Sequence, residues 1–406
     1  MGRSFGARAS RMQGDARERR RPFGPSSIAG GDPAPRGARI RAIGPPRGAL
    51  RLGALAAVLV AVYVAGLGLE PLGANPYLRT ASQLVEDGTL ARGAWGMGFP
   101  LVIAPAEALG GTTAVELFLV AIAALGFVLG ALLARRIVPE PYASAAAALA
   151  GLSAPAIVYA GEIGPQAMAG TLLAGATLCT AIARDAPRVA PVFGAAAMLA
   201  VLPWLDPVYV VPAVPVAAAL YVWCRRARHP TLGLIAVELA AASVVLYATF
   251  NERLYNGPTP WSALPTGISA TGAHTVAEHL ERVPRLVTLW VDPADGLLRW
   301  APVFALVFFA AWLLRRSRWE GLARVVPARA SAEAAAGLAL AVVAAVLLVA
   351  AFLVPRIDTV PFSARFLVPA LPVAAAPVAW GLRHAPRLGA VLGAATLALS
   401  AWLFVS

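Results

Sequence analysis

The sequence contains no lysine, so all 34 of its basic residues are arginine. Charged residues make up only 14% of the chain and hydrophobic residues 59%, whereas about a quarter of the residues in an ordinary soluble domain are charged. This scarcity of charge excludes an ordinary soluble protein. It predicts that most of the chain lies within a membrane.

Cysteine is almost absent as well. Cys179 lies inside an apolar stretch and Cys224 at the end of another, and neither has a second metal-binding side chain at the spacing of a metal site. No Walker loop or dinucleotide fingerprint occurs in the chain. We interpret both cysteines as packing residues, and the ligand spacing implies no metal.

Apolar stretches of about 20 residues, the length that crosses a membrane, fill the chain after residue 50. There are about eleven, at residues 50–69, 112–134, 141–160, 165–183, 189–204, 207–224, 231–250, 298–314, 333–354, 366–382 and 388–405. We therefore expect an all-α, polytopic transmembrane helix bundle over residues 50–406. The pair Gly126 and Gly130 has the spacing that allows two such helices to pack closely.

Residues 1–49 are rich in arginine, glycine and proline and have no apolar periodicity. We expect them to form a disordered cytosolic tail.

The arginines flank the apolar stretches alternately. With the N-terminus inside, 26 of them fall on the cytosolic side and 8 on the outer side, as the positive-inside rule requires. This bias predicts a multi-pass protein of the inner (plasma) membrane with its C-terminus outside. It also explains the net charge of +13 by contact with membrane lipid, so that no nucleic-acid partner is needed.

Two outer loops are long, at residues 70–111 and 251–297. In the first, residues 80–90 have the pattern of an interfacial helix, with Leu84 and Val85 toward the membrane and Glu86 and Asp87 toward water. Residues 96–109 are apolar but too short to cross, which indicates a second interfacial or re-entrant segment. No cytosolic loop has comparable content, so we expect any functional site to face outward.

Carboxylates at the outer membrane face can accept a proton from a hydroxyl group. Glu70 directly follows the first span and Asp87 lies on the interfacial segment, so both are candidate catalytic residues. The alternative for each is a solvated loop acid. Arg365, at the start of a span, is a candidate ligand for a lipid phosphate.

Glu238 differs from these acids because it lies well inside the stretch 231–250, toward its cytosolic half. An ionisable residue at that depth is costly. We expect it to be protonated or paired with a polar group, such as Ser243 on the same helix or a residue of another span. A structural pairing is favoured over proton transport.

Several short motifs, in order, resemble the GT-C type membrane glycosyltransferases, the group that includes protein O-mannosyltransferases and lipid A aminoarabinose transferases. The resemblance covers residues 50–382. The motifs are NPYLRTA at 75–81, LVEDGTL at 84–90, GFPLVIAP at 98–105, SAP at 153–155, EIGPQ at 162–166, NGP at 256–258, DGLL at 295–298 and SARFLVPALP at 363–372.

Membership would imply a polyprenyl-phosphate-linked sugar donor, with transfer to an acceptor hydroxyl on the outer face and, in some members, a divalent metal. The resemblance then assigns substrate-binding positions to one group of residues: Asn75, Tyr77, Glu162, Gln166 and Arg365.

The chain departs from the family pattern at two positions. The family usually has an acid at the start of the first loop, where this chain has Asn75, and an amide cannot act as a base. Gln166 stands where a second acid is common. Either Glu70 or Asp87 takes the catalytic role, or the protein binds lipid-linked sugar without turning it over.

Three functions therefore compete. The first is a glycosyltransferase, and the second is a non-catalytic binder or scaffold in envelope assembly. The third is a transporter, which would show inverted repeats and paired polar residues near the bilayer midplane. The sequence shows no internal repeat, and Glu238 alone lies deep.

Overall fold

The computed structural model describes residues 47–69, 75–89, 96–264, 269, 271–293, 296–320, 326–354 and 363–405. Residues 45–406 form one compact unit. Most of the tail expected at 1–49 lies outside the described residues. Every regular element in the described ranges is a helix, which confirms the all-α class.

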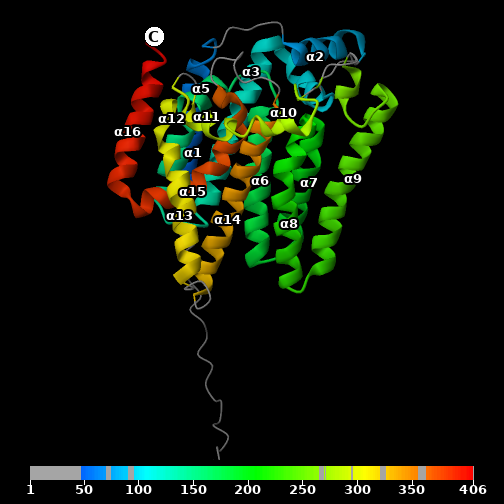
Figure 1. Ribbon diagram of the computed structural model, residues 1–406. Coiled ribbons are helices and arrows are strands. Elements are labelled where there is room, and N and C mark those ends of the chain that lie inside the picture. The colour runs from blue at the N-terminus through cyan, green and yellow to red at the C-terminus, as the bar shows by residue number, and fades with distance from the viewer. Residues whose placement is uncertain are drawn as a thin grey trace, which may run out of the picture. The chain divides into compact units, whose positions relative to one another are not determined.

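The long helices stand side by side and run alternately up and down (Figure 1). They are α1 (Arg47–Ala65), α3 (Gly98–Ala134), α4 (Tyr142–Gly151), α6 (Gln166–Asp185), α7 (Val189–Leu205), α8 (Val210–Arg226), α9 (Pro230–Tyr255), α13 (Ala305–Glu320), α14 (Pro327–Leu348), α15 (Leu371–His384) and α16 (Pro386–Trp402). Short elements lie between them: α2 (Pro76–Asp87), α5 (Ala154–Val158), η1 (Pro207–Tyr209), η2 (Pro260–Ala263), α10 (Val276–Leu280), α11 (Arg285–Val291), α12 (Leu297–Trp300), η3 (Pro302–Phe304), η5 (Val349–Leu353) and η6 (Ser363–Ala370).

Seven helices in the described residues are long and apolar enough to cross a membrane. They are Gly48–Ala65, Gly98–Ala134, Gln166–Asp185, Pro207–Arg226, Pro230–Ser262, Ala328–Leu353 and Arg365–His384. Each coincides with a predicted span. The other four predicted stretches, 141–160, 189–204, 298–314 and 388–405, contain helices too short for this criterion.

The stretch 141–160 is not one continuous helix, because the chain breaks there into α4 and α5. Pro155 stands in the first turn of α5, where its missing N–H costs nothing, whereas inside a continuous helix it would remove a hydrogen bond. The free carbonyl of Gly151 at the break accepts a hydrogen bond of 2.8 Å from the Tyr63 hydroxyl of α1.

The centre of the bundle is formed by α6 and by the span Arg365–His384, which includes α15. In the apolar stretches of these two spans 78% and 89% of the residues are buried, compared with 17% in the span of α1. Here α3 packs closely, as the glycine pair predicted. A Cβ at Gly130 would lie 2.2 Å from the carbonyl oxygen of Pro372, and one at Gly126 would lie 2.6 Å from Oγ1 of Thr171. Thr171 Oγ1 also donates to the carbonyl of Ile122 at 2.8 Å.

Helix α3 is in fact two helices joined at a kink. Gly110 and Gly111 have non-helical backbone angles, with φ +63° and ψ −155° at Gly111, a conformation essentially restricted to glycine. The kink separates residues 98–109, predicted not to cross, from 112–134, predicted to cross. Ser82 Oγ of α2 donates to Glu107 Oε1 at 3.0 Å, which holds α2 against the first half of α3.

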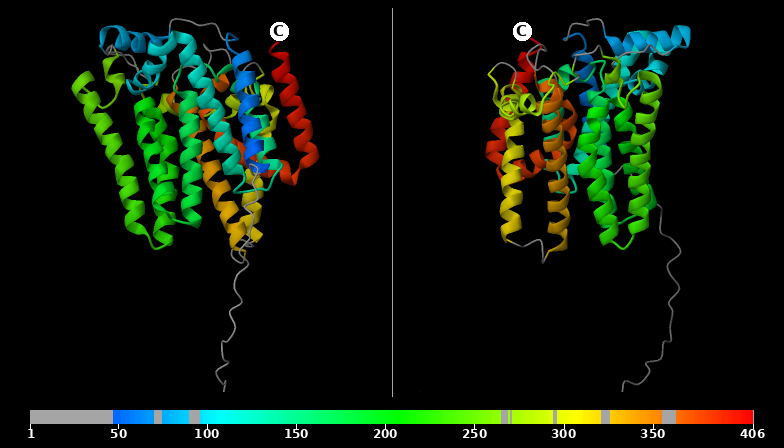
Figure 2. Two further views of the ribbon diagram at one scale, coloured as in Figure 1. Left: turned by 180° about the vertical axis from the view of Figure 1, so that it is seen from behind. Right: turned by 45° about the vertical axis from the view of Figure 1, so that its right-hand side comes forward.

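Helix α2 lies across the ends of the long helices rather than alongside them (Figures 1 and 2). The same end carries α5, α10, α11 and α12, and we call it the loop-rich end. The opposite ends of α8 and α13 carry the pairs Arg225–Arg226 and Arg315–Arg316, so we call that end the arginine-rich end.

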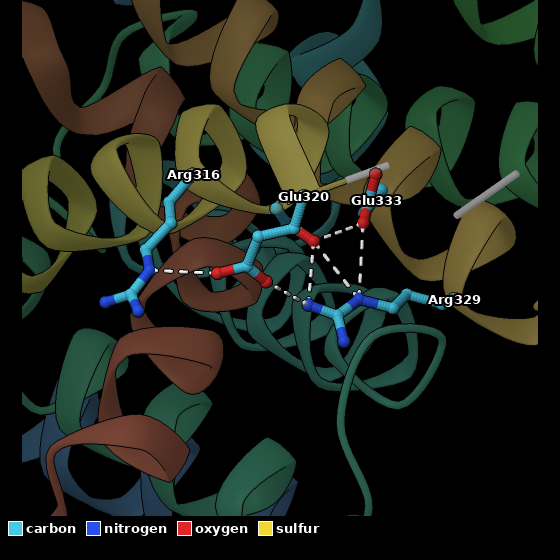
Figure 3. A network of polar contacts seen from close by, with 5 residues as sticks. Arg316, Glu320, Arg329 and Glu333 are labelled. Carbon is cyan, nitrogen blue, oxygen red and sulfur yellow. Dashed lines mark hydrogen bonds and ion pairs between the residues drawn. The ribbon is translucent and has the colours of Figure 1, made fainter. Parts of the chain in front are cut away.

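Ion pairs join helices at the arginine-rich end. Arg136, two residues after the end of α3, pairs with Asp185 of α6, and Asp185 also accepts a hydrogen bond of 2.7 Å from Ser331 of α14. A second network, shown in Figure 3, connects α13 to α14. In it the buried Glu333 accepts a hydrogen bond from Ser317 and faces Arg329 at 3.4 Å.

Replacing Arg329 by methionine should lower the free energy of unfolding by about 1–3 kcal/mol, because the buried Glu333 carboxylate loses its cationic partner. Arg316→Met is the matched control, since Arg316 pairs with Glu320 while 62% of its side chain is exposed and such pairs contribute about 0–1 kcal/mol. Thermal unfolding of the detergent-purified variants measures both. Equal effects of the two substitutions would contradict this account of the network.

Candidate functional site

An ion pair at the loop-rich end joins two segments far apart in the sequence. Arg365, in η6, pairs with Glu162, in the connection from α5 to α6. The side chains are 25% and 9% exposed, respectively, so the pair is largely shielded from water, which strengthens its attraction. The Nε–H of Arg365 is buried and has no acceptor among the described residues, so one donor of the guanidinium is unsatisfied within the described chain.

Asn75 ties the first loop to the same connection. Its Oδ1 accepts hydrogen bonds from the N–H of Tyr77 at 2.9 Å and of Leu78 at 3.3 Å, which caps α2. Its Nδ2 donates to the carbonyl of Ile163 at 2.6 Å, beside Glu162. The amide is used as donor and acceptor at once, which an ionised aspartate cannot do.

Tyr77, two residues further on, is half-buried and packs edge-on against Phe99 of α3, with 5.2 Å between the ring centroids. Its removal from water raises the pKa of the phenol above its ordinary value, and the nearby Asp206 carboxylate adds to the rise. Arg365 acts in the opposite direction. Tyr77, Asp206 and Arg365 therefore share one electrostatic neighbourhood.

Asp206 is a residue that the sequence analysis did not select. It follows α7, and its Oδ1 accepts a hydrogen bond of 3.0 Å from the N–H of Val208, capping η1. Burial raises the pKa of its carboxyl to about 6, although the bond from Val208 opposes the rise. Asp206 is also close enough to Tyr209 and Tyr247 to act on them electrostatically.

A close backbone approach holds Asp206 next to the first loop. A Cβ at Gly98 would lie 2.3 Å from the carbonyl oxygen of Trp204, and one at Gly96 would lie 3.1 Å from that of Leu205. Glycine is needed at position 98 because any side chain would collide with the Trp204 backbone. The start of α3 therefore rests directly on the segment that ends in Asp206.

Trp204 and Tyr247 form an aromatic wall beside this segment, with their ring centroids 5.5 Å apart. The Trp204 indole donates to Ser243 Oγ at 2.9 Å, and the Tyr247 hydroxyl is buried. An aromatic face beside a carboxylate can pack against an apolar ring face while a polar group is bound.

Gln166, at the start of α6, has a buried Oε1 that accepts no hydrogen bond from the described residues. Next to it lies a small apolar pocket. Its lining comes from α3, α5, α6, η6 and α15 and consists of Ala123, Phe127, Ala156, Tyr159, Ala160, Ala167, Val368 and Pro372. Three of these lining residues, Ala160, Ala167 and Val368, are each within three residues of Glu162, Gln166 or Arg365 in the sequence.

The structure thus brings together Asn75, Tyr77, Glu162 and Arg365, with Gln166 on the same connection. It does not bring Asp87 to them. Asp87 is exposed at the last residue of α2, about 18 Å along the helix from Asn75 at 1.5 Å per residue. Glu70, the other predicted catalytic acid, lies outside the described residues.

A divalent metal needs several oxygen or nitrogen ligands at one point. Within the ranges that the structure covers, no group of three or more His, Cys, Asp or Glu side chains gathers in this way. The described donors therefore do not fit the metal that the family resemblance allows.

No protein-family model matches the chain, and no curated protein matches it significantly in sequence. Solved structures do match its fold. ArnT from Cupriavidus metallidurans in the apo state aligns over 86% of this chain and 62% of its own, with TM-score 0.56 and 17% identity. ArnT bound to undecaprenyl phosphate aligns over 84% and 62%, with the same TM-score of 0.56 and 17% identity.

The arabinosyltransferase EmbB from Mycobacterium smegmatis aligns over 91% of this chain and 42% of its own, with TM-score 0.48 and 17% identity. The chain spans about three fifths of the length of the ArnT chains that it matches, which are covered to 62%.

The chain therefore has the fold of the GT-C type membrane glycosyltransferases, as the sequence resemblance predicted. ArnT is one solved structure that shares this fold.

Asn75→Asp should lower the free energy of unfolding by about 1–3 kcal/mol, because a carboxylate would face the Ile163 carbonyl where the amide now donates. Asn251→Asp is the matched control, since the Asn251 amide also donates to a carbonyl, that of Tyr247 at 2.7 Å, but within one helix. Limited proteolysis followed by mass spectrometry compares the two variants by the extent of cleavage at residues 75–78 and at 162–166. Only Asn75→Asp should expose both segments; protection equal to wild type would contradict the bridging role.

Proposed function

We propose that the protein is a membrane glycosyltransferase that moves a sugar from a polyprenyl-phosphate-linked donor to a hydroxyl of a cell-envelope acceptor on the outer face. One observation carries the proposal: at the loop-rich end, Glu162 holds the guanidinium of Arg365, whose buried Nε–H has no acceptor in the described part of the chain. The shared fold with ArnT, of which one structure contains undecaprenyl phosphate, supports the same donor class.

Arg365 is suited to the phosphate of such a donor. A guanidinium presents five donors in a fork that matches phosphate oxygens, and Glu162 occupies only part of that fork. The apolar pocket lined in part by Ala160 and Val368 supplies a water-poor surface beside the charge. A charged head next to an apolar hollow fits a lipid phosphate better than a soluble nucleotide sugar.

Transfer requires the acceptor oxygen to attack the anomeric carbon while the bond from that carbon to the phosphate oxygen breaks. The leaving polyprenyl phosphate gains negative charge, which Arg365 would stabilise. The acceptor hydroxyl loses its proton, and we assign that proton to Asp206. Among the described acids of the loop-rich end, Asp206 combines a pKa of about 6 with the neighbourhood of Arg365 and Tyr77.

In this proposal Asp206 takes the role that the sequence analysis gave to Glu70 or Asp87. The exposed position of Asp87, one helix length from Asn75, supports Asp206 over Asp87. Glu70 keeps its candidacy on sequence grounds. Asn75 is a positioning residue that holds α2 against the connection carrying Glu162.

The topology belongs to the same proposal. We place the N-terminus in the cytosol and the C-terminus outside, with about eleven spans in the inner (plasma) membrane. The gathering of the arginine clusters at the ends of α8 and α13 supports this orientation (Figure 1). The loop-rich end then faces outward, where lipid-linked sugars are presented.

A second candidate is a non-catalytic protein that binds lipid-linked sugar or scaffolds envelope assembly. It is favoured by Asn75, whose amide is consumed by structural hydrogen bonds. Binding without turnover would select it, and turnover would exclude it. A transporter finds less support, because Glu238 is exposed on the outside of α9 instead of lining a path between helices.

Arg365→Gln should reduce sugar transfer by about 100-fold or more, since a charge that stabilises the leaving phosphate is removed. Arg79→Gln is the matched control: Arg79 is an exposed arginine on α2 at the same end, and its loss should change the rate less than about twofold. Membranes containing each variant are supplied with polyprenyl-phosphate-linked sugars and assayed for transfer. Absence of transfer with every donor would contradict the proposed function.

The rate of transfer should rise with pH through about 6 and then level, because Asp206 accepts a proton only as the carboxylate. Asp206→Asn should remove most of the activity, together with this rising limb. Asp87→Asn should leave the rate and its pH profile unchanged. If Asp87→Asn abolishes transfer and Asp206→Asn does not, the base has been assigned to the wrong residue.

A further inference from the structure

Helix α9 stands at the edge of the bundle (Figures 1 and 2) and packs on one side against α7 and α8. Its other side is an exposed apolar stripe, in which Leu234, Ile235, Leu239, Val245 and Leu246 are 46–65% exposed. Glu238 is exposed in the middle of this stripe.

The depth of Glu238 makes its position costly. It lies eight residues after Pro230, the first residue of α9, and so about 12 Å along the helix in a hydrocarbon layer of about 30 Å. In the described part of the chain it has no ion pair or hydrogen bond. An uncovered carboxyl at this depth is unfavourable even when protonated.

The partner expected from the sequence, Ser243, is not available to Glu238. Its hydroxyl donates to the carbonyl of Ala200 at 2.6 Å and accepts from the Trp204 indole at 2.9 Å, both on α7. The stripe thus contains an acid that the chain itself leaves unsatisfied. Exposure alone is ordinary for a lipid-facing helix: α1 is equally uncovered but carries no charged residue after Arg51.

We propose that this stripe is a dimer interface, in which α9 packs against α9 of a second copy and the two Glu238 carboxyls hydrogen-bond to each other. A two-fold axis along the membrane normal places identical residues opposite one another at the same depth. A protonated carboxyl is both donor and acceptor, so a second Glu238 satisfies it without any basic residue in a span.

The surroundings of Glu238 allow this approach. Ala241 and Ala242 follow one turn later on the exposed side, and small residues let two helix backbones come close. Within α9 the described arginine is Arg253, in the last turn of the helix, so the α9 of a second copy brings no arginine to the depth of Glu238. A hydrogen bond between the Glu238 carboxyls of the two copies is therefore the polar contact that α9 can form at this depth.

The test measures the stoichiometry of the full chain, reconstituted in liposomes and counted by single-molecule photobleaching. Wild type should be dimeric. Glu238→Ala should weaken the dimer by about tenfold, whereas Glu238→Gln, which keeps a donor and an acceptor, should stay within about threefold of wild type. Glu252→Gln is the matched control, because Glu252 is an exposed acid on the same helix but near its outer end.

A cross-link gives the geometry. With Cys179 and Cys224 replaced by alanine, Ala242→Cys should form a disulfide between copies on oxidation. Val58→Cys, on the equally exposed face of α1, should not. A monomer at every protein density would overturn the proposal and would point to lipid or to a different membrane protein as the occupant. A dimer that Glu238→Ala leaves intact, or that Ala242→Cys fails to cross-link, would overturn it as well.

Discussion

The cost of placing polar groups in hydrocarbon organises this molecule. Backbone groups satisfy one another inside helices, and most charged side chains lie toward the two ends of the bundle, with Glu238 of α9 as an exception. At the arginine-rich end they are consumed by structural networks such as Ser317–Glu333–Arg329. At the loop-rich end, by contrast, the Nε–H of Arg365 stays unsatisfied although its guanidinium pairs with Glu162. This difference between the two ends is the reason for locating function at the loop-rich end.

The loop-rich end is assembled from segments distant in sequence. Each segment is held in place by a kink, a hydrogen bond or a close backbone contact. The kink at Gly111 separates the crossing part of α3 from the part that supports α2. The Asn75 amide joins α2 to Ile163, and Gly98 lets the start of α3 rest on the segment that ends in Asp206. Asn75 bonds to Ile163, which is next to Glu162, the partner of Arg365. We therefore expect a substitution at Asn75 to change the position of the Arg365 side chain.

Periodicity and charge placement predicted much of the fold from sequence. The all-α class, the positions of the long helices, the separate helical segments before 112 and the close approach at Gly126 and Gly130 all follow from local rules. The break between α4 and α5 was missed because Pro155 stands within a long apolar stretch, where composition outweighed the proline.

The site was predictable only in part. Arg365 and Glu162 were each selected as single residues, but their pairing depends on tertiary structure that joins positions about two hundred residues apart. Asp206 was missed because an Asp-Pro after a span looks like an ordinary loop acid. Its significance comes from burial and from Tyr77, Tyr209 and Tyr247 nearby. Of the alternatives predicted for Glu238, a pairing with Ser243 is not found, because the Ser243 hydroxyl bonds to α7.

The most direct test of the central claim is an experimental structure of the full chain in a lipid bilayer, determined with a polyprenyl phosphate at saturating concentration. The account predicts density for the phosphate group within hydrogen-bonding distance of Arg365, with the first isoprene units against the apolar pocket at Ala160 and Val368. Phosphate bound instead among the arginines of α8 and α13, or no bound lipid at the loop-rich end, would contradict it.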